Sequence, residues 1–134
     1  MTHITLTRPD RSLLHDALRL DAAVTGANGL AYLVAAGPLE DLLGLSSGLL
    51  RGAGAVLVAF AAAVLVAGMR RTPPVSAVRG IIAVNAVWAL DSLVAAAAGW
   101  GSPSTAGTVW IVAQALTVAG FAVLQALGSR RAAG

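Results

Sequence analysis

The sequence lacks cysteine and lysine altogether and contains only two histidines. Without cysteine, disulfides, thiol catalysis, iron–sulfur clusters and covalently attached haem are excluded. His3 and His15 both precede the first long apolar segment, so no two imidazoles within apolar segments can ligate a haem iron. We therefore expect the protein to bind no metal and no cofactor.

Charged residues are also scarce. Only 11% of the 134 residues are charged, 57% are hydrophobic, and the mean hydropathy is +0.81. This composition lies far outside that of soluble domains and indicates a membrane protein. The net charge of +3 comes from arginines in short flanks of apolar segments, which suits contact with a lipid bilayer. No basic groove with interleaved aromatics is present, so we expect no nucleic-acid partner.

Long apolar segments make up most of the chain. Four of them are long enough to cross the hydrocarbon core of about 30 Å as helices: residues 18–36, 49–69, 78–98 and 105–127. The short connections carry turn residues, as in "GPLEDLLGLSSG" from Gly37, "RRTPP" from Arg70 and "GWGSPSTAG" from Gly99. The predicted fold is therefore an all-α bundle of four transmembrane helices, with neighbouring helices antiparallel.

The arginines are distributed unevenly between the two sides of this predicted bundle. Arg51 stands alone on one side, and eight arginines lie on the other: Arg8, Arg11, Arg19, Arg70, Arg71, Arg79, Arg130 and Arg131. Cytoplasmic flanks of membrane proteins hold the excess of positive residues. We therefore expect a multi-pass protein of the cytoplasmic membrane with both termini in the cytoplasm.

Residues 1–17 precede the first predicted span and are expected to form a short amphipathic cytoplasmic helix that continues into it. Its apolar residues can lie on the membrane surface while its charged residues face water: Leu13, Leu14, Ala17 and Leu18 on one side, Arg11, Asp16 and Arg19 on the other. The acidic residues of this segment disfavour a cleaved signal peptide, because the first region of such a peptide is positively charged.

The two halves of the chain resemble each other. A shift of 60 residues pairs Arg19 with Arg79, "LVAA" at Leu33 with "LVAA" at Leu93, and Gly68 with Gly128. Under this shift, 16 of the 53 positions from residue 19 to residue 71 are identical, whereas about seven would be expected by chance in so alanine-rich a chain. Two parallel-repeated helical hairpins are one interpretation, and biased composition is the other.

Polar side chains recur at helical spacing inside the predicted spans. Asp21, Thr25, Asn28 and Tyr32 share one face of the first span. Asp21 is expected near the headgroups, whereas Asn28 lies roughly 15 Å deep at 1.5 Å per residue and is expected to be buried. On the third span Asn85, Trp88 and Ser92 share a face, and on the fourth the shared face carries Trp110, Gln114, Thr117, Phe121 and Gln125.

Asp91 is the most informative of these residues, because a carboxylate near the midplane of a bilayer is costly unless it meets partners. It lies roughly 18 Å deep, at the level of Gln114. We predict a polar layer at this depth formed by Asp91, Asn28, Gln114, Thr117, Trp88 and Asn85. Either Asp91 is the ionisable group of a transporter, or the layer supplies hydrogen bonds between helices.

Small residues recur every three or four positions on the second span: Gly48, Gly52, Ala55, Ala59 and Ala63. Small residues let helices approach closely, so this strip is predicted to pack within the bundle or between protomers. Arg51 is expected to extend to the interface, and a salt bridge from Arg51 to Asp91 is the alternative.

Two segments, "RLDAAVTGANGLAYLVAAGPL" from Arg19 and "GTVWIVAQALTVAGFAVLQAL" from Gly107, resemble small four-span integral membrane proteins of high-GC Gram-positive bacteria. The activity of that group is uncharacterised, so the resemblance implies location and topology without a mechanism.

No motif in the sequence supports catalysis. A nucleophile–base pair, a glycine-rich phosphate loop and paired carboxylates cannot be assembled from it, so we expect no enzymatic activity. The predicted function is that of a structural or accessory membrane subunit, forming a homo-oligomer or binding a membrane partner. The alternative is a minimal transporter or channel that uses Asp91.

Overall fold

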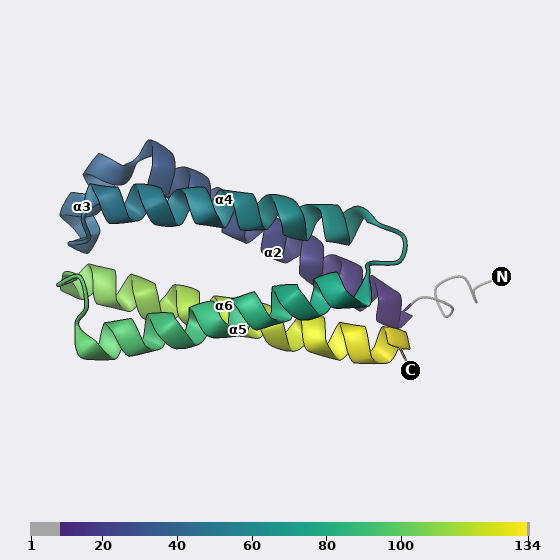
Figure 1. The fold of residues 1–134 in the computed structure, drawn as a ribbon. Coiled ribbons are helices and arrows are strands. Elements are labelled where there is room, and N and C mark those ends of the chain that lie inside the picture. Colours follow the sequence, from purple (N-terminus) through teal and green to yellow (C-terminus); the bar gives the residue numbers. More distant parts are fainter. Residues whose placement is uncertain (1–8, 134) are drawn as a thin grey trace.

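The computed structural model describes residues 9–133, with side chains for residues 13–131. Within this part of the chain all regular structure is helical and no strand is present, which confirms the all-α prediction. The helices are α2 (Pro9–Val34), α3 (Ala36–Leu43), α4 (Ser47–Met69), α5 (Val75–Ala98) and α6 (Thr105–Ala133). In Figure 1, α5 and α6 lie side by side, and α2 runs obliquely from beside α4, near α3, to beside the end of α6. Arg8 lies outside the described residues.

Three helices, α4, α5 and α6, are each long and apolar enough to cross a membrane. Helices α2 and α3 meet this criterion only when they are counted as one span, and the chain bends by 96° at the break between them. Pro38 explains the break, because in a straight continuation of α2 its ring would clash with the carbonyl of Val34. It lies instead in the first turn of α3, where its missing N–H is not needed. The segment from Gly37, predicted as a turn, therefore contains a helix.

Helices α2 and α4 pack closely against each other through glycine. A Cβ placed on Gly29 would lie 2.9 Å from the carbonyl oxygen of Gly54, and one on Gly54 would lie 2.7 Å from that of Gly29. The two backbones can approach this closely only because neither residue has a side chain. Around this crossing, Tyr32, Leu50 and Leu57 belong to a buried cluster of hydrophobic residues.

The predicted packing strip of α4 faces away from the other helices. All five of its residues are exposed, and a Cβ added at Gly48 or Gly52 would meet nothing within 4 Å. The buried face of α4 consists of Leu50, Gly54, Leu57, Ala61, Val64, Ala67 and Gly68. Packing of the strip within the molecule was therefore a wrong prediction. Glycine and alanine occur on several sides of this helix, so their spacing could not identify its inner face.

The last residues of the segment predicted as a lead-in on the membrane surface pack inside the molecule instead. Leu14, Ala17 and Leu18 are buried, and Leu14 and Leu18 form a core cluster with residues of α4 and α5. A Cβ on Gly128 of α6 would lie 2.8 Å from the Leu14 Cα atom, so α2 and α6 also touch closely. Helix α2 thus contributes packing surface well before residue 18, where the first apolar span was predicted to begin.

Helix α2 packs extensively against both α4 and α6, whereas α4 and α5 touch little. The shift of 60 residues pairs α2 with α5 and α4 with α6. If a two-fold axis related the two hairpins, α4 would pack against α5 as extensively as α2 packs against α6. The packing of the helices does not follow such an axis. Whether the sequence repeat reflects duplicated hairpins stays a prediction.

Near both ends of the molecule, side chains form hydrogen bonds with the backbone of neighbouring helices. The Arg19 Nε donates a hydrogen bond of 2.9 Å to the carbonyl of Gly68, near the end of α4. At the other end of the molecule, the Ser104 hydroxyl donates to the carbonyl of Leu42 at 2.7 Å and accepts from the Gly107 N–H at 3.0 Å. Ser104 therefore caps α6 and holds α3 against it.

Candidate functional site

Four polar side chains from three helices meet in the interior of the molecule. Asp21 and Gln125 have no exposed surface, Asn85 is 2% exposed and Thr25 is 6% exposed. The carboxylate of Asp21 accepts hydrogen bonds from Thr25 Oγ1 at 2.7 Å, Asn85 Nδ2 at 2.8 Å and Gln125 Nε2 at 2.7 Å. The Asn85 amide also donates to Gln125 Oε1 at 3.0 Å. We call these four residues the Asp21 cluster.

The Asp21 cluster satisfies the polar groups that it buries. An isolated carboxylate in an apolar interior is strongly disfavoured, and charge-assisted hydrogen bonds offset much of this penalty. No described buried side-chain nitrogen or oxygen lacks a hydrogen-bond partner. Because Asp21 lies on α2, Asn85 on α5 and Gln125 on α6, the cluster fixes the position of these three helices relative to one another.

The burial of Asp21 differs from its prediction. Asn85, its partner, lies ten residues into α5, which is about 15 Å along the helix axis. Asp21 itself follows the first residue of α2 by twelve positions, so it lies well inside the helix rather than near its end. Asn28, predicted as the buried polar residue, is only half-buried. The prediction for these two residues was therefore reversed, because α2 begins earlier than its apolar run.

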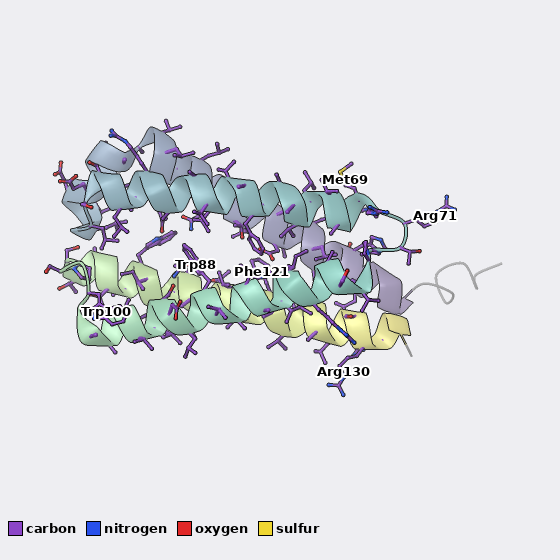
Figure 2. The ribbon with its side chains drawn as sticks, viewed as in Figure 1. Met69, Arg71, Trp88, Trp100, Phe121 and Arg130 are labelled. Carbon is purple, nitrogen blue, oxygen red and sulfur yellow. The ribbon has the colours of Figure 1, made fainter. Side chains whose placement is uncertain are left out.

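Part of the predicted polar layer lines one cavity. A cavity of about 470 Å³ lies between α2 and α6, and its walls include Asn28, Gln114 and Thr117. Trp88 Nε1 donates to Gln114 Oε1 at 3.0 Å, so Trp88 is connected to this group. Figure 2 shows Trp88 on α5, directed toward the interior. The sixth polar residue of the predicted layer, Asn85, belongs to the Asp21 cluster instead.

Asp91 does not join this group. It is exposed, it does not line the cavity between α2 and α6, and it makes no hydrogen bond or ion pair to Arg51 or to any other side chain among residues 13–131. Asp91 follows the inward-facing Asn85 by six residues, which rotates it about 120° around the axis of α5. The layer assembled around Asp91 was thus a wrong prediction, and the alternative of an Arg51–Asp91 salt bridge is not realised within the described residues.

A second polar contact joins α2 to α6 nearer the other end of α2. Trp110 Nε1 donates to the Tyr32 hydroxyl at 2.7 Å. Thr117 makes only a hydrogen bond within its own helix, to the carbonyl of Ala113 at 2.9 Å. In the described part of the chain, no group of three or more histidine, aspartate or glutamate residues is arranged to hold a metal ion.

Sequence reasoning missed the Asp21 cluster, although two signals could have revealed it. Thr25 follows Asp21 by four residues, which is the spacing of side chains that bond on one helix face. Gln125 follows Gln114 by eleven residues, about 16 Å along α6, and so lies near the level of Asn85. A depth count for every polar residue, including Gln125, would have brought these residues together.

The comparisons with known proteins add no assignment. No protein-family model, curated protein or solved structure matches the chain. Composition and fold define the class instead. The described residues form an all-helical protein with three helices apolar enough to cross a membrane, and α2 and α3 meet the same criterion when they are taken together as one bent span.

Proposed function

We propose that this chain is an integral protein of the cytoplasmic membrane, with four spans and both termini in the cytoplasm, that acts as a structural or accessory subunit and associates with a second copy of itself. The bent pair α2 and α3 serves as the first span in this proposal. The arginine excess at the end where α6 finishes supports the orientation. In Figure 2, Arg71 and Arg130 both lie at that end, and Trp100 lies at the opposite one.

The Asp21 cluster supports the assignment of α2 as a span. An aspartate within a span is tolerated when it faces other helices and meets hydrogen-bond donors. Asp21 is fully buried and meets three donors. Its role in this proposal is structural, because no cavity described here has Asp21 in its wall.

The single observation that carries the association is the exposure of Asp91. This carboxylate lies seven residues before the end of α5, about 10 Å along the axis from the end of the span. A carboxylate facing lipid at that depth is costly, so a covering surface that supplies a positive charge would stabilise it. The described part of the chain supplies no such partner from within.

Arg51 offers the complementary charge. It is exposed on α4 and lies three residues after Gly48 and four before Ala55, so it shares the face of the small-residue strip. It follows the start of α4 by four residues, about 6 Å, and therefore lies within about 4 Å of the depth of Asp91. Helix α4 of one copy packed on α5 of another would bring Arg51 to Asp91, with the strip allowing close approach.

A charge exchange tests this association. Arg51→Asp and Asp91→Arg should each reduce the fraction of dimer measured by light scattering in mild detergent, and the double variant should restore it. Arg71→Asp, at the other end of the molecule, is the matched control and should leave the dimer intact. A wild-type protein that is monomeric in both detergent and lipid nanodiscs, or a double variant that fails to recover, would refute association through this pair.

The alternative is a minimal transporter or channel with Asp91 as its ionisable group. It requires a water-filled route to Asp91, and the cavity between α2 and α6 is lined by Asn28, Gln114 and Thr117 without it. Asp91→Asn separates the two functions in sealed vesicles that report proton or ion flux. Loss of a pH-dependent flux in this variant, with an unchanged dimer fraction, would favour transport.

A further inference from the structure

A second cavity, of about 360 Å³, lies at the arginine-rich end of the molecule. The start of α5 and the end of α6 form most of its wall, together with Leu14 of α2 and the connection between α4 and α5. The cavity is therefore built from three segments that are distant in the sequence: Leu14, residues 72–82 and residues 126–130. Its volume falls within the range of small-ligand sites, about 300–1,000 Å³.

The lining of this cavity is divided between two kinds of chemistry. Arg79 of α5 and Arg130 of α6 line the cavity, and Thr72 and Ser129 are the other polar residues in its wall. Neither arginine pairs with another side chain among those of residues 13–131. The rest of the wall is apolar or nearly so: Leu14, Pro73, Val75, Val78, Ile82 and Ala126.

The N-terminus of α5 strengthens the positive character of the site. Val75, the first residue of this 24-residue helix, lines the cavity. Pro74, at the N-cap position, has no side-chain hydrogen bond to the free N–H groups of the first turn. Free N–H groups and the helix dipole favour an anion at such an end. Two arginines without a side-chain partner among residues 13–131 and an uncapped helix start thus border one space.

We propose that this cavity binds the phosphate group of an anionic phospholipid, with Arg79 and Arg130 on the phosphate oxygens and the first carbons of the lipid against the apolar wall. Arginine suits a phosphate because its planar guanidinium can donate two parallel hydrogen bonds to the oxygens. Basic pockets between membrane helices on the cytoplasmic side bind lipid headgroups in this manner.

The apolar wall favours a lipid over free phosphate. Val78 and Ile82 extend the cavity along α5 away from the arginines, to about 10 Å from the start of that helix. Inorganic phosphate would leave this apolar surface without a partner, whereas the glycerol and first acyl carbons of a lipid would cover it. The inference rests on the proposed function in one respect only, that this end of the molecule lies at a membrane surface.

The test uses the full-length protein, purified in a non-ionic detergent, and native mass spectrometry to measure bound phosphatidylglycerol, phosphatidylcholine and inorganic phosphate. We expect phosphatidylglycerol to bind more tightly than either of the others. Arg79→Gln and Arg130→Gln should each weaken phosphatidylglycerol binding about fivefold, and the double variant about 25-fold. Arg71→Gln combined with Arg131→Gln removes the same charge from outside the cavity and should weaken binding less than twofold.

A second variant tests the cavity independently of charge. Ala126→Phe fills the apolar part of the space and should weaken phosphatidylglycerol binding at unchanged net charge, with helix content verified by circular dichroism. Equal losses in the two double-arginine variants would indicate a diffuse basic surface and overturn the proposal. Equal binding of phosphatidylcholine, or binding of inorganic phosphate as tight as that of the lipid, would overturn it as well.

The failure of this proposal can be told apart from the failure of the proposed function. Lipid binding by the purified protein does not depend on its orientation in a cell or on its dimer fraction. A wrong orientation would be detected by thiol labelling of intact cells, and the arginine variants would still report on the cavity.

Discussion

The side chains of Asp21 and Asn85 are separated by 64 residues and meet in a buried hydrogen bond of 2.8 Å. This contact joins the first long helix to the third, beside the core cluster in which Leu14 and Leu18 meet Val78 and Ile81. Gln125 completes the link from α6, since its amide donates to the same carboxylate oxygen at 2.7 Å. The relative position of α2, α5 and α6 therefore depends on polar contacts as well as on apolar packing.

Removal of the Asp21 carboxylate should destabilise the fold. Asp21→Leu leaves the Asn85 and Gln125 amides without their acceptor, and we expect the free energy of unfolding to fall by about 1–2 kcal/mol. Asp21→Asn can keep its carbonyl oxygen toward Asn85 and Gln125 and turn its amide toward the Thr25 hydroxyl, which can accept, so it should destabilise less than Asp21→Leu. Asp41→Asn, at an exposed carboxylate of α3, is the control and should be silent. Equilibrium unfolding in detergent measures all three, and an unaffected Asp21→Leu variant would contradict the role of the cluster.

The close contact between α2 and α4 leads to a second prediction about stability. Gly54→Ala places a Cβ only 2.7 Å from the carbonyl oxygen of Gly29, so the two backbones must move apart. We expect a loss of about 1–3 kcal/mol in the free energy of unfolding. Gly52→Ala, two residues earlier, meets nothing within 4 Å and should be neutral or slightly stabilising. Equal effects of the two substitutions in thermal unfolding would contradict the assigned face of α4.

Ser104 provides a third test, at the junction of α3 and α6. Ser104→Ala removes the cap of α6 and the hydrogen bond to the Leu42 carbonyl. Loss of a serine cap typically costs about 1 kcal/mol, and α3 should become more accessible to protease. Ser102→Ala, in the same connection, changes an exposed residue and is the matched control. The prediction fails if both variants unfold at the same temperature and are cleaved at the same rate.

The orientation can be measured directly because the chain has no cysteine of its own. A cysteine at the exposed position Ser102 should react with a membrane-impermeant thiol reagent in intact cells, and one at Thr72 should react only after the cells are opened. Both positions lie in connections between helices, so neither substitution disturbs the core. Labelling of the Thr72 variant from outside would reverse the proposed orientation.

Helix content and approximate spans could be predicted because they depend on local composition. Long apolar segments flanked by turn residues identify α4, α5 and α6 to within a few residues. The same logic misjudged both ends of the first span. Leu14 and Leu18 belong to the core although charged residues surround them in the sequence, and Pro38 bends the chain into α3 where a loop was expected.

The sequence by itself determined the class of this protein: apolar segments long enough to span a membrane, an uneven distribution of arginines and a few polar residues at helical spacing. Only the tertiary structure decided which sides of those helices face inward. It exposed Asp91 and the small-residue strip of α4, and it buried Asp21 against Asn85 and Gln125. The physical reason is that helical periodicity fixes which residues share a face, whereas rotation about the helix axis is set by packing between helices distant in the sequence.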